Sequence, residues 1–148
     1  AVECVTDTIE DYSFEIGKGV QLKDGKDVTI IACGLMVQEA LKAHKILEDE
    51  GISARVIDMH TIKPIDREII LKAAEETGAI VTAEEHNVIG GLGAAVAEVL
   101  VQNESVPTEF VGVQDTFGHS ASPATLLKHY GLTPENIAAK AKKAISRK

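Results

Sequence analysis

Residues 79–102 read AIVTAEEHNVIGGLGAAVAEVLVQ, and they join a short apolar run to a helix-like segment through a glycine cluster. AIVTA (79–83) has the length and composition of a buried strand, and GLGAAVAEVLVQ (91–102) is typical of a helix of small residues. A strand that feeds a helix of this length predicts a right-handed crossover to a parallel strand. This stretch therefore predicts one unit of an α/β fold.

The same alternation extends in both directions along the chain. LMVQEALKAHKILEDEG (35–51) has one apolar helical face and ends at a glycine, and ARVIDM (54–59) and EFVGV (109–113) are predicted strands. Asp66 is a predicted cap of a helix ending at Gly78, and Ser122-Pro123 and Thr133-Pro134 predict two further helix starts. KGVQL (18–22) and DVTIIAC (27–33) flank KDGK, which indicates a hairpin. We expect a three-layer α/β domain, with a mainly parallel open sheet and helices on both faces.

Composition limits the class of protein. The 148 residues carry a net charge of −8 and are 45% hydrophobic but only 3% aromatic, as suits one aliphatic core. The charge argues against nucleic acid or an anionic membrane as a partner, and no apolar run reaches the about 18 residues of a membrane span. The acidic N-terminus is unlike a signal peptide, so a cytoplasmic protein is expected. Five basic residues close the chain, and we expect them to complement a helix dipole: Lys140, Lys142, Lys143, Arg147 and Lys148.

The glycine cluster could cradle a phosphate or allow close packing. A dinucleotide fingerprint needs a third glycine or alanine where this chain has Val96, and a P-loop needs a lysine that is missing here. The sequence therefore favours Gly90, Gly91 and Gly93 as structural glycines that allow positive φ and close approach of the backbone.

Polar residues follow the predicted strands, at the edge where open α/β sheets place their sites. His86 is the one catalytic candidate, because histidine titrates near neutrality and an acidic pair precedes it, although no nucleophile is evident. We expect the loops after three strands to converge into an interface or a contact for an anion. The candidate residues are His60, Glu84, Glu85, His86, Asp115, His119 and Ser120. The histidines lack metal-ligand spacing, His44 is expected to pack against the core, and Cys4 and Cys33 are expected to stay reduced.

Four segments together resemble the C-terminal domain of the transketolase family, from about Phe14 to Ile145. They are KDVTIIACGLMVQEALKA, ARVIDMHTIKPID, TAEEHNVIGGLGAAVAEVL and VQDTFGHSASPATLLKHYGLTPENI. The first three are shared with the β-subunits of 2-oxo acid dehydrogenases and with deoxyxylulose phosphate synthase, and the last is the most similar to transketolase. Ser120-Ala121 stands where transketolases commonly have Ser-Gly.

The resemblance implies a parent enzyme that transfers a two-carbon ketol unit from a ketose phosphate to an aldose phosphate. Such enzymes hold thiamine diphosphate and Mg²⁺ between two other domains of a dimer. The family's Gly-Asp-Gly motif for the metal diphosphate does not occur in this sequence. We therefore expect residues 1–148 to be a single third domain, with residues 1–13 as a remnant of the preceding linker. It would bind no cofactor itself, and its partners would be the remaining domains or an N-terminal subunit, in a homodimer. The alternatives are a related thiamine-diphosphate enzyme or a free-standing binding or regulatory module.

Overall fold

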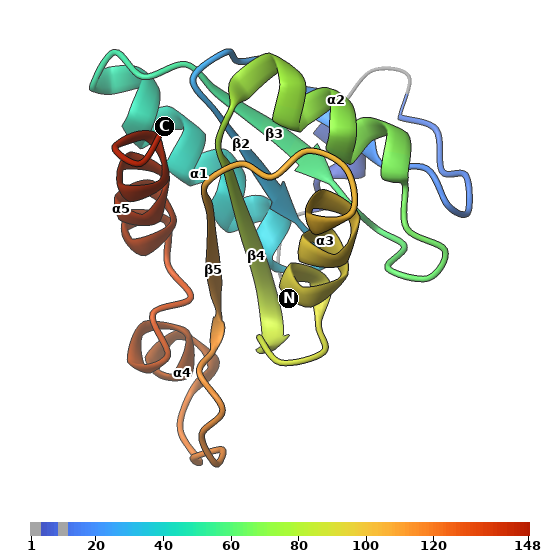
Figure 1. The fold of residues 1–148 in the computed structure, drawn as a ribbon. Helices are drawn as coiled ribbons and strands as arrows, with labels where there is room; N and C mark the ends of the chain where they lie inside the picture. Colours follow the sequence, from blue (N-terminus) through green and yellow to red (C-terminus); the bar gives the residue numbers. More distant parts are fainter. Residues whose placement is uncertain (1–3, 9–11) are drawn as a thin grey trace.

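A computed structural model describes residues 4–8 and 12–148 (Figure 1). The expected linker remnant, residues 1–13, lies partly outside these ranges. The helices and strands follow the alternation expected from the sequence, in the order η1 (Thr6–Thr8), β1 (Val20–Lys23), β2 (Val28–Ala32), α1 (Met36–Asp49), β3 (Ala54–Asp58), α2 (Arg67–Thr77), β4 (Ile80–Asn87), α3 (Leu92–Val101), β5 (Thr108–Val113), α4 (Pro123–His129) and α5 (Pro134–Ile145).

Within the described residues, five strands form one sheet in the order β1-β3-β2-β4-β5. β2 pairs in parallel with both β3 and β4, β5 pairs in parallel with β4, and β1 runs antiparallel to β3. The expected mainly parallel sheet is confirmed. The expected hairpin between KGVQL and DVTIIAC is wrong, because β3 lies between β1 and β2. Gly25 permits this arrangement: its backbone lies against the start of β3, where an added Cβ would be 2.3 Å from the carbonyl carbon of Ala54.

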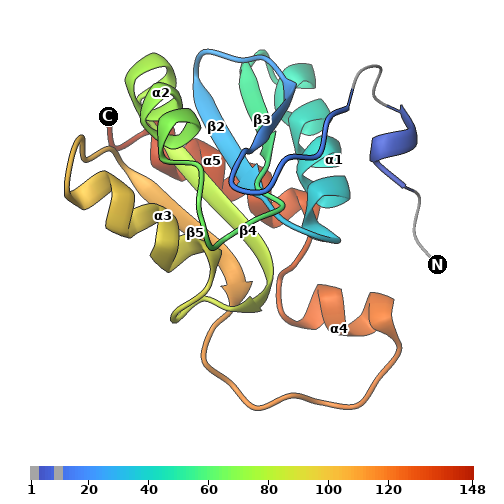
Figure 2. The same ribbon diagram turned by 90° about the vertical axis from the view of Figure 1, so that its right-hand side faces the viewer.

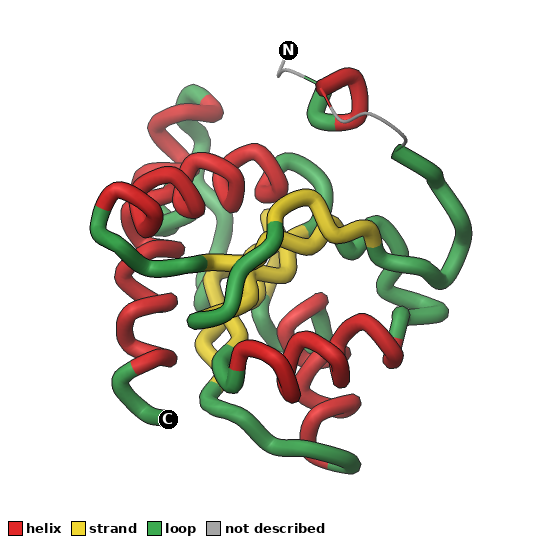
Figure 3. The backbone as a smooth tube through the Cα atoms, turned by 90° about the horizontal axis from the view of Figure 1, so that it is seen from above, coloured by secondary structure: helices red, strands yellow, loops and turns green. Residues whose placement is uncertain are grey.

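Helices cover both faces of the sheet, and Figures 2 and 3 show the strands between two groups of helices. One apolar cluster joins the sheet to α1 and α5, and the other joins it to α2 and α3. The three-layer arrangement is confirmed. No helix of the described residues is long and apolar enough to cross a membrane.

The predicted helix ends follow local chemistry. The Asp66 carboxylate accepts a hydrogen bond from the backbone N–H of Ile69, and Gly78 ends α2 in the left-handed conformation, with φ of 64°. The hydroxyls of Ser122 and Thr133 cap α4 and α5 in the same way, with proline at the start of each helix. All three caps are confirmed.

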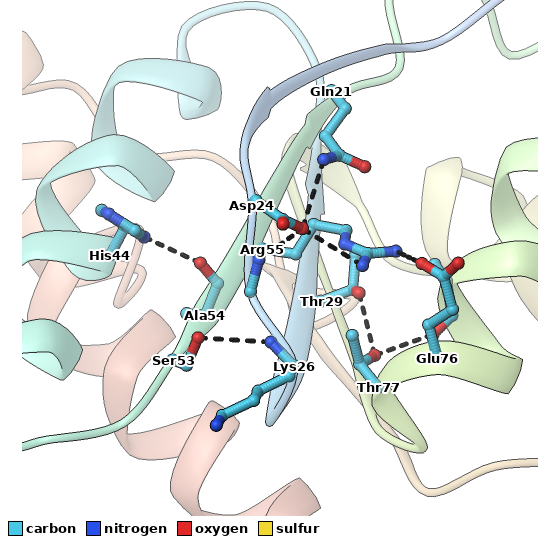
Figure 4. A network of polar contacts seen from close by, with 12 residues as sticks. Gln21, Asp24, Lys26, Thr29, His44, Ser53, Ala54, Arg55, Glu76 and Thr77 are labelled. Carbon is cyan, nitrogen blue, oxygen red and sulfur yellow. Dashed lines mark hydrogen bonds and ion pairs between the residues drawn. The ribbon is translucent and has the colours of Figure 1, made fainter.

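A buried arginine near the start of β3 joins this strand to α2 and to the turn after β1 (Figure 4). Arg55, on β3, lies 2.6 Å from the Glu76 carboxylate of α2 and 3.2 Å from Asp24, in the turn after β1. His44 contributes there too, since its Nδ1 lies 2.8 Å from the carbonyl oxygen of Ala54 while its ring is half-buried against the core. The Arg55–Asp24 pair holds the β1–β2 connection against β3, while the other two contacts join β3 to α2 and to α1.

The basic C-terminus is paired with acidic side chains. Glu109, a buried residue on β5, lies within 3.0 Å of Lys140 and Lys143 and 2.7 Å from Arg147. Lys142 pairs with Glu50 at 2.9 Å. The expectation that these cations complement a helix dipole is therefore incomplete, because four of them form ion pairs with specific carboxylates. Burial alone would raise the pKa of Glu109, but the hydrogen bonds from Lys140 and Lys143 lower it to about 2.

This shifted pKa predicts a dependence of stability on acid. The pKa of Glu109 is lower in the folded chain than its ordinary value of 4.5, so its contribution is complete above that value and is lost as the pH falls towards 2. We expect Glu109→Gln to have a lower free energy of unfolding than the wild type at pH 7. This difference should shrink steadily as the pH falls from about 5 to about 2.5. Urea unfolding across this range measures it. Glu98→Gln, at an exposed position of α3, is the matched control, and an equal gap at all pH values would contradict the assignment.

Candidate functional site

The carboxyl ends of β2, β3, β4 and β5 meet at one edge of the sheet, which we call the carboxyl edge. The expectation that the candidate segments emerge on one side is therefore confirmed. One boundary is wrong: β4 does not stop at Ala83 but continues to Asn87. Between Ala83 and Asn87 its pairing with β5 is irregular, since Ala83 pairs with Val111 and Asn87 with Val113. Such a bulge re-aims side chains, and here it separates a buried glutamate from an exposed one.

Glu84 is the buried member of the acidic pair, with 1% of its surface exposed. Its carboxylate accepts hydrogen bonds from the backbone N–H groups of Leu92, at 2.7 Å, and Gly93, at 2.9 Å. These are N–H groups at the start of α3, which have no partner within the helix and attract a negative charge. Glu84 therefore takes the place that a phosphate would take at this helix.

The three glycines differ in what they allow. Gly90 has φ of 76° and open space around it, whereas Gly91 has φ of −92° and does not use the left-handed region. The expectation of positive φ thus holds at Gly90 and is wrong at Gly91 and Gly93. A Cβ on Gly91 would lie 2.0 Å from Glu84 Oε2, and one on Gly93 would lie 2.9 Å from Thr82 Oγ1. Gly91 and Gly93 let the start of α3 approach β4 closely.

The exposed part of this stretch lines an open pocket of about 380 Å³. Glu85 and His86 are both exposed, and His86 Nδ1 lies 2.8 Å from the carbonyl oxygen of Asn87 and 3.9 Å from Glu84 Oε2. The pocket is completed by residues after β2 and after β3, namely Cys33, Gly34, Leu35 and Ile62 together with Gly90 and Gly91. The structure thus brings Glu84, Glu85 and His86 together, and the proposed catalytic role of His86 stays a prediction.

Both cysteines are free, as expected. Burial raises the pKa of the Cys33 thiol to about 11, with smaller contributions from the carboxylates of Glu84 and Asp58. A thiol reacts as its thiolate, so Cys33 is a poor nucleophile despite its place in the pocket.

His60 lies on the other side of β2, beyond the end of β3, and packs against the N-terminal segment. Its ring centroid is 4.4 Å from that of Phe14 and 6.4 Å from that of Tyr12, and both of its ring nitrogens are buried. Asp58, which sequence analysis missed, accepts a hydrogen bond of 2.9 Å from the Tyr12 hydroxyl. Burial raises the pKa of Asp58, and burial together with this carboxylate raises the pKa of Tyr12 to about 12. The sequence did contain a signal for Asp58, because an acidic residue ends a strand that is otherwise apolar enough to be buried.

The remaining candidates lie in the segment that follows β5. The Asn87 side-chain amide donates a 3.0 Å hydrogen bond to Asp115, which joins this segment to the end of β4. His119 lies farther along, where its backbone N–H and Nδ1 are 2.9 and 3.0 Å from the Tyr130 hydroxyl. Ser120 is exposed. Asp115 therefore belongs with the Glu84–His86 group, and His119 with α4.

Comparison with known proteins agrees with this architecture. The profile of the family described as "Transketolase, C-terminal domain" matches residues 17–137. The chain belongs to the transketolase C-terminal domain family. A "Putative transketolase C-terminal section" from Methanocaldococcus jannaschii is 50% identical over 92% of this chain and 42% of its own length. A "1-deoxy-D-xylulose-5-phosphate synthase" from Heliobacterium modesticaldum is 44% identical over 83% of this chain and 19% of its own.

A solved structure is similar as well. It is described as "Split gene transketolase, inactive beta4 tetramer", with a TM-score of 0.90 and 56% identity, over 93% of this chain and 45% of the solved chain. The transketolase-family chain described here thus spans less than half the length of these relatives.

Proposed function

We propose that the chain is the C-terminal domain of a cytoplasmic, thiamine-diphosphate-dependent transketolase that transfers a two-carbon ketol unit from a ketose phosphate to an aldose phosphate. The observation that carries the proposal is the likeness to the split-gene transketolase over 93% of the chain. The match to the transketolase C-terminal domain profile supports the same assignment. The chain's own part in this proposal is to pack against the remaining domains or subunit and to support a homodimer.

The residues of this chain do not fit thiamine diphosphate. The glycine-rich start of α3 is the place where a diphosphate would be expected, but the Glu84 carboxylate already accepts the N–H groups of Leu92 and Gly93 there. A buried negative charge at that point repels an anion. Among residues 4–8 and 12–148, no group of three or more His, Cys, Asp or Glu side chains could hold a metal ion. We therefore assign cofactor and Mg²⁺ binding to the other domains of the complete enzyme.

The isolated chain is expected to have no ketol-transfer activity and no measurable affinity for thiamine diphosphate, even with Mg²⁺ supplied. The cofactor carries the chemistry of this reaction, and the chain offers no site for it. Calorimetric titration and a ketol-transfer assay measure both points, with the complete enzyme as the positive control. Turnover by the isolated chain would overturn the proposal. Release of CO₂ from a 2-oxo acid by the complete enzyme would instead favour one of the related thiamine-diphosphate enzymes.

A further inference from the structure

The exposed apolar side chains of the described residues are gathered at the carboxyl edge. Among residues 4–8 and 12–148, six large hydrophobic residues are exposed. Of these six, only Val101, at the end of α3, lies away from the carboxyl edge. Ile62, Ile89 and Phe117 follow β3, β4 and β5, and Phe14 and Ile16 precede β1, whose first residue pairs with the last residue of β3. Phe14 stacks on His60, Ile62 lines the pocket beside Glu84, and Ile89 lies in the connection from β4 to α3. The five residues line the carboxyl edge from the segment before β1 to the segment after β5, at its two ends in Figure 1, and exposed apolar groups that line one side of a domain mark an interaction surface.

Phe117 is the most exposed of the five, at 95%. It belongs to residues 114–122, which we call the arm, a segment exposed along its whole length that projects beyond the sheet (Figures 1 and 2). Tyr130 fastens the arm from α4: its hydroxyl accepts the backbone N–H of His119 and donates to the carbonyl oxygen of Phe117, at 2.9 and 3.2 Å. Asn87 fastens the base of the arm through Asp115. The arm is therefore held in place while its phenylalanine stays exposed to solvent.

The chain also enters the fold at this edge. Tyr12 is bonded to Asp58 and Phe14 packs on His60, both at the carboxyl end of β3. The matched section of the relatives is called C-terminal, and this chain covers 42% of one relative and 45% of the solved chain. In such a chain the preceding part is connected through this N-terminal segment, which contains Phe14 and Ile16 and is hydrogen-bonded through Gly17 to Thr61, next to Ile62.

We infer that the carboxyl edge is the docking surface for the preceding domain of the transketolase chain, with Phe117 as its anchor. The inference rests on the proposed function, and it adds which residues make the contact. An aromatic side chain seated in a partner's pocket dominates many interfaces. The matching surface is therefore an apolar hollow for the Phe117 ring. Its rim is basic, to complement two exposed carboxylates: Glu85, which lines the pocket with Ile62, and Asp115, which lies in the arm with Phe117.

Cysteine labelling tests the inference in the complete enzyme. Phe117→Cys and Val101→Cys would be made separately in a Cys4→Ser background, where the half-buried Cys33 thiol, with its raised pKa, reacts slowly. We expect maleimide to label the thiol introduced at position 117 roughly tenfold more slowly in the complete enzyme than in the isolated chain, because a docked anchor is shielded from solvent. The thiol introduced at position 101, which is exposed and lies away from the carboxyl edge, should react at the same rate in both. Equal rates at position 117 would overturn the inference.

A second copy of this chain is the other occupant that the test can reveal. Protection of the thiol at position 117 in the isolated chain, rising with protein concentration and with solution mass, would assign the surface to self-association and overturn the inference. Tyr130→Phe provides a second readout, since loss of the hydroxyl should speed hydrogen exchange of residues 117–119 in the isolated chain and weaken protection in the complete enzyme. A ketol-transfer assay on the same samples keeps the two proposals apart. Protection of the thiol at position 117 without ketol-transfer activity would contradict the proposed function but support the docking surface.

Discussion

Glu84→Ala is expected to lower the free energy of unfolding by about 3–5 kcal/mol, because two buried N–H donors lose their acceptor. The carboxylate is 1% exposed and bonds to Leu92 and Gly93 at the start of α3. An unsatisfied buried donor costs about 1–3 kcal/mol, and the removed side chain leaves a cavity as well. For a chain of this length the melting temperature should fall by roughly 10 °C. Thermal and urea unfolding measure the effect.

Glu85→Ala is the matched control, since the neighbouring carboxylate is exposed. A surface substitution of this kind changes stability by about 0.5 kcal/mol or less. Glu84→Gln should fall between the two variants, because its amide oxygen can accept one N–H while its NH₂ group faces the other donor. Equal unfolding midpoints for Glu84→Ala and Glu85→Ala would contradict the role assigned to the buried carboxylate.

The acidic pair shows where sequence reasoning stops. Periodicity predicted the strand, the helix and their order, because these depend on local patterns of apolar residues. It could not tell Glu84 from Glu85, because that distinction depends on the bulge in β4 opposite Val111 and Val113. A bulge inserts residues without changing composition, so only the pairing with β5 reveals it. The sequence therefore predicted the cluster of polar residues, but it did not predict which of the two carboxylates is buried and which is exposed.

Long-range pairing accounts for the other differences. KDGK has the composition of a hairpin turn, yet β1 pairs with β3, and Gly25 allows the connection to lie close to the backbone at Ala54. The basic tail had a local explanation in the helix dipole, and its ion pairs with Glu109 join residues more than 30 positions apart. Local chemistry did suffice where the interaction is local, as the caps at Asp66, Ser122 and Thr133 show.

Gly91→Ala should cost about 2–4 kcal/mol through steric overlap rather than backbone strain. The new Cβ would lie 2.0 Å from Glu84 Oε2 and 2.8 Å from the carbonyl oxygen of Asn87. The carboxylate cannot move away without giving up its bonds to α3, and the carbonyl belongs to the backbone. Gly90→Ala is the neighbouring control: it meets open space but has φ of 76°, so strain alone should cost about 1 kcal/mol. Urea unfolding of the two variants compares the costs.

The double variant Glu84→Ala/Gly91→Ala separates this account from a general intolerance of the turn. Removing the carboxylate removes the nearest obstacle to the new methyl group at position 91, and the Asn87 carbonyl remains close. Two changes at groups in direct contact are not additive. The loss of unfolding free energy caused by Gly91→Ala should therefore be smaller in the Glu84→Ala background than in the wild type, by about 1 kcal/mol or more. Gly90→Ala should cost the same in both backgrounds. If Gly91→Ala lowers the free energy of unfolding equally in both backgrounds, the glycine is needed only for the backbone conformation. The fit between the turn and Glu84 would then not set the position of α3.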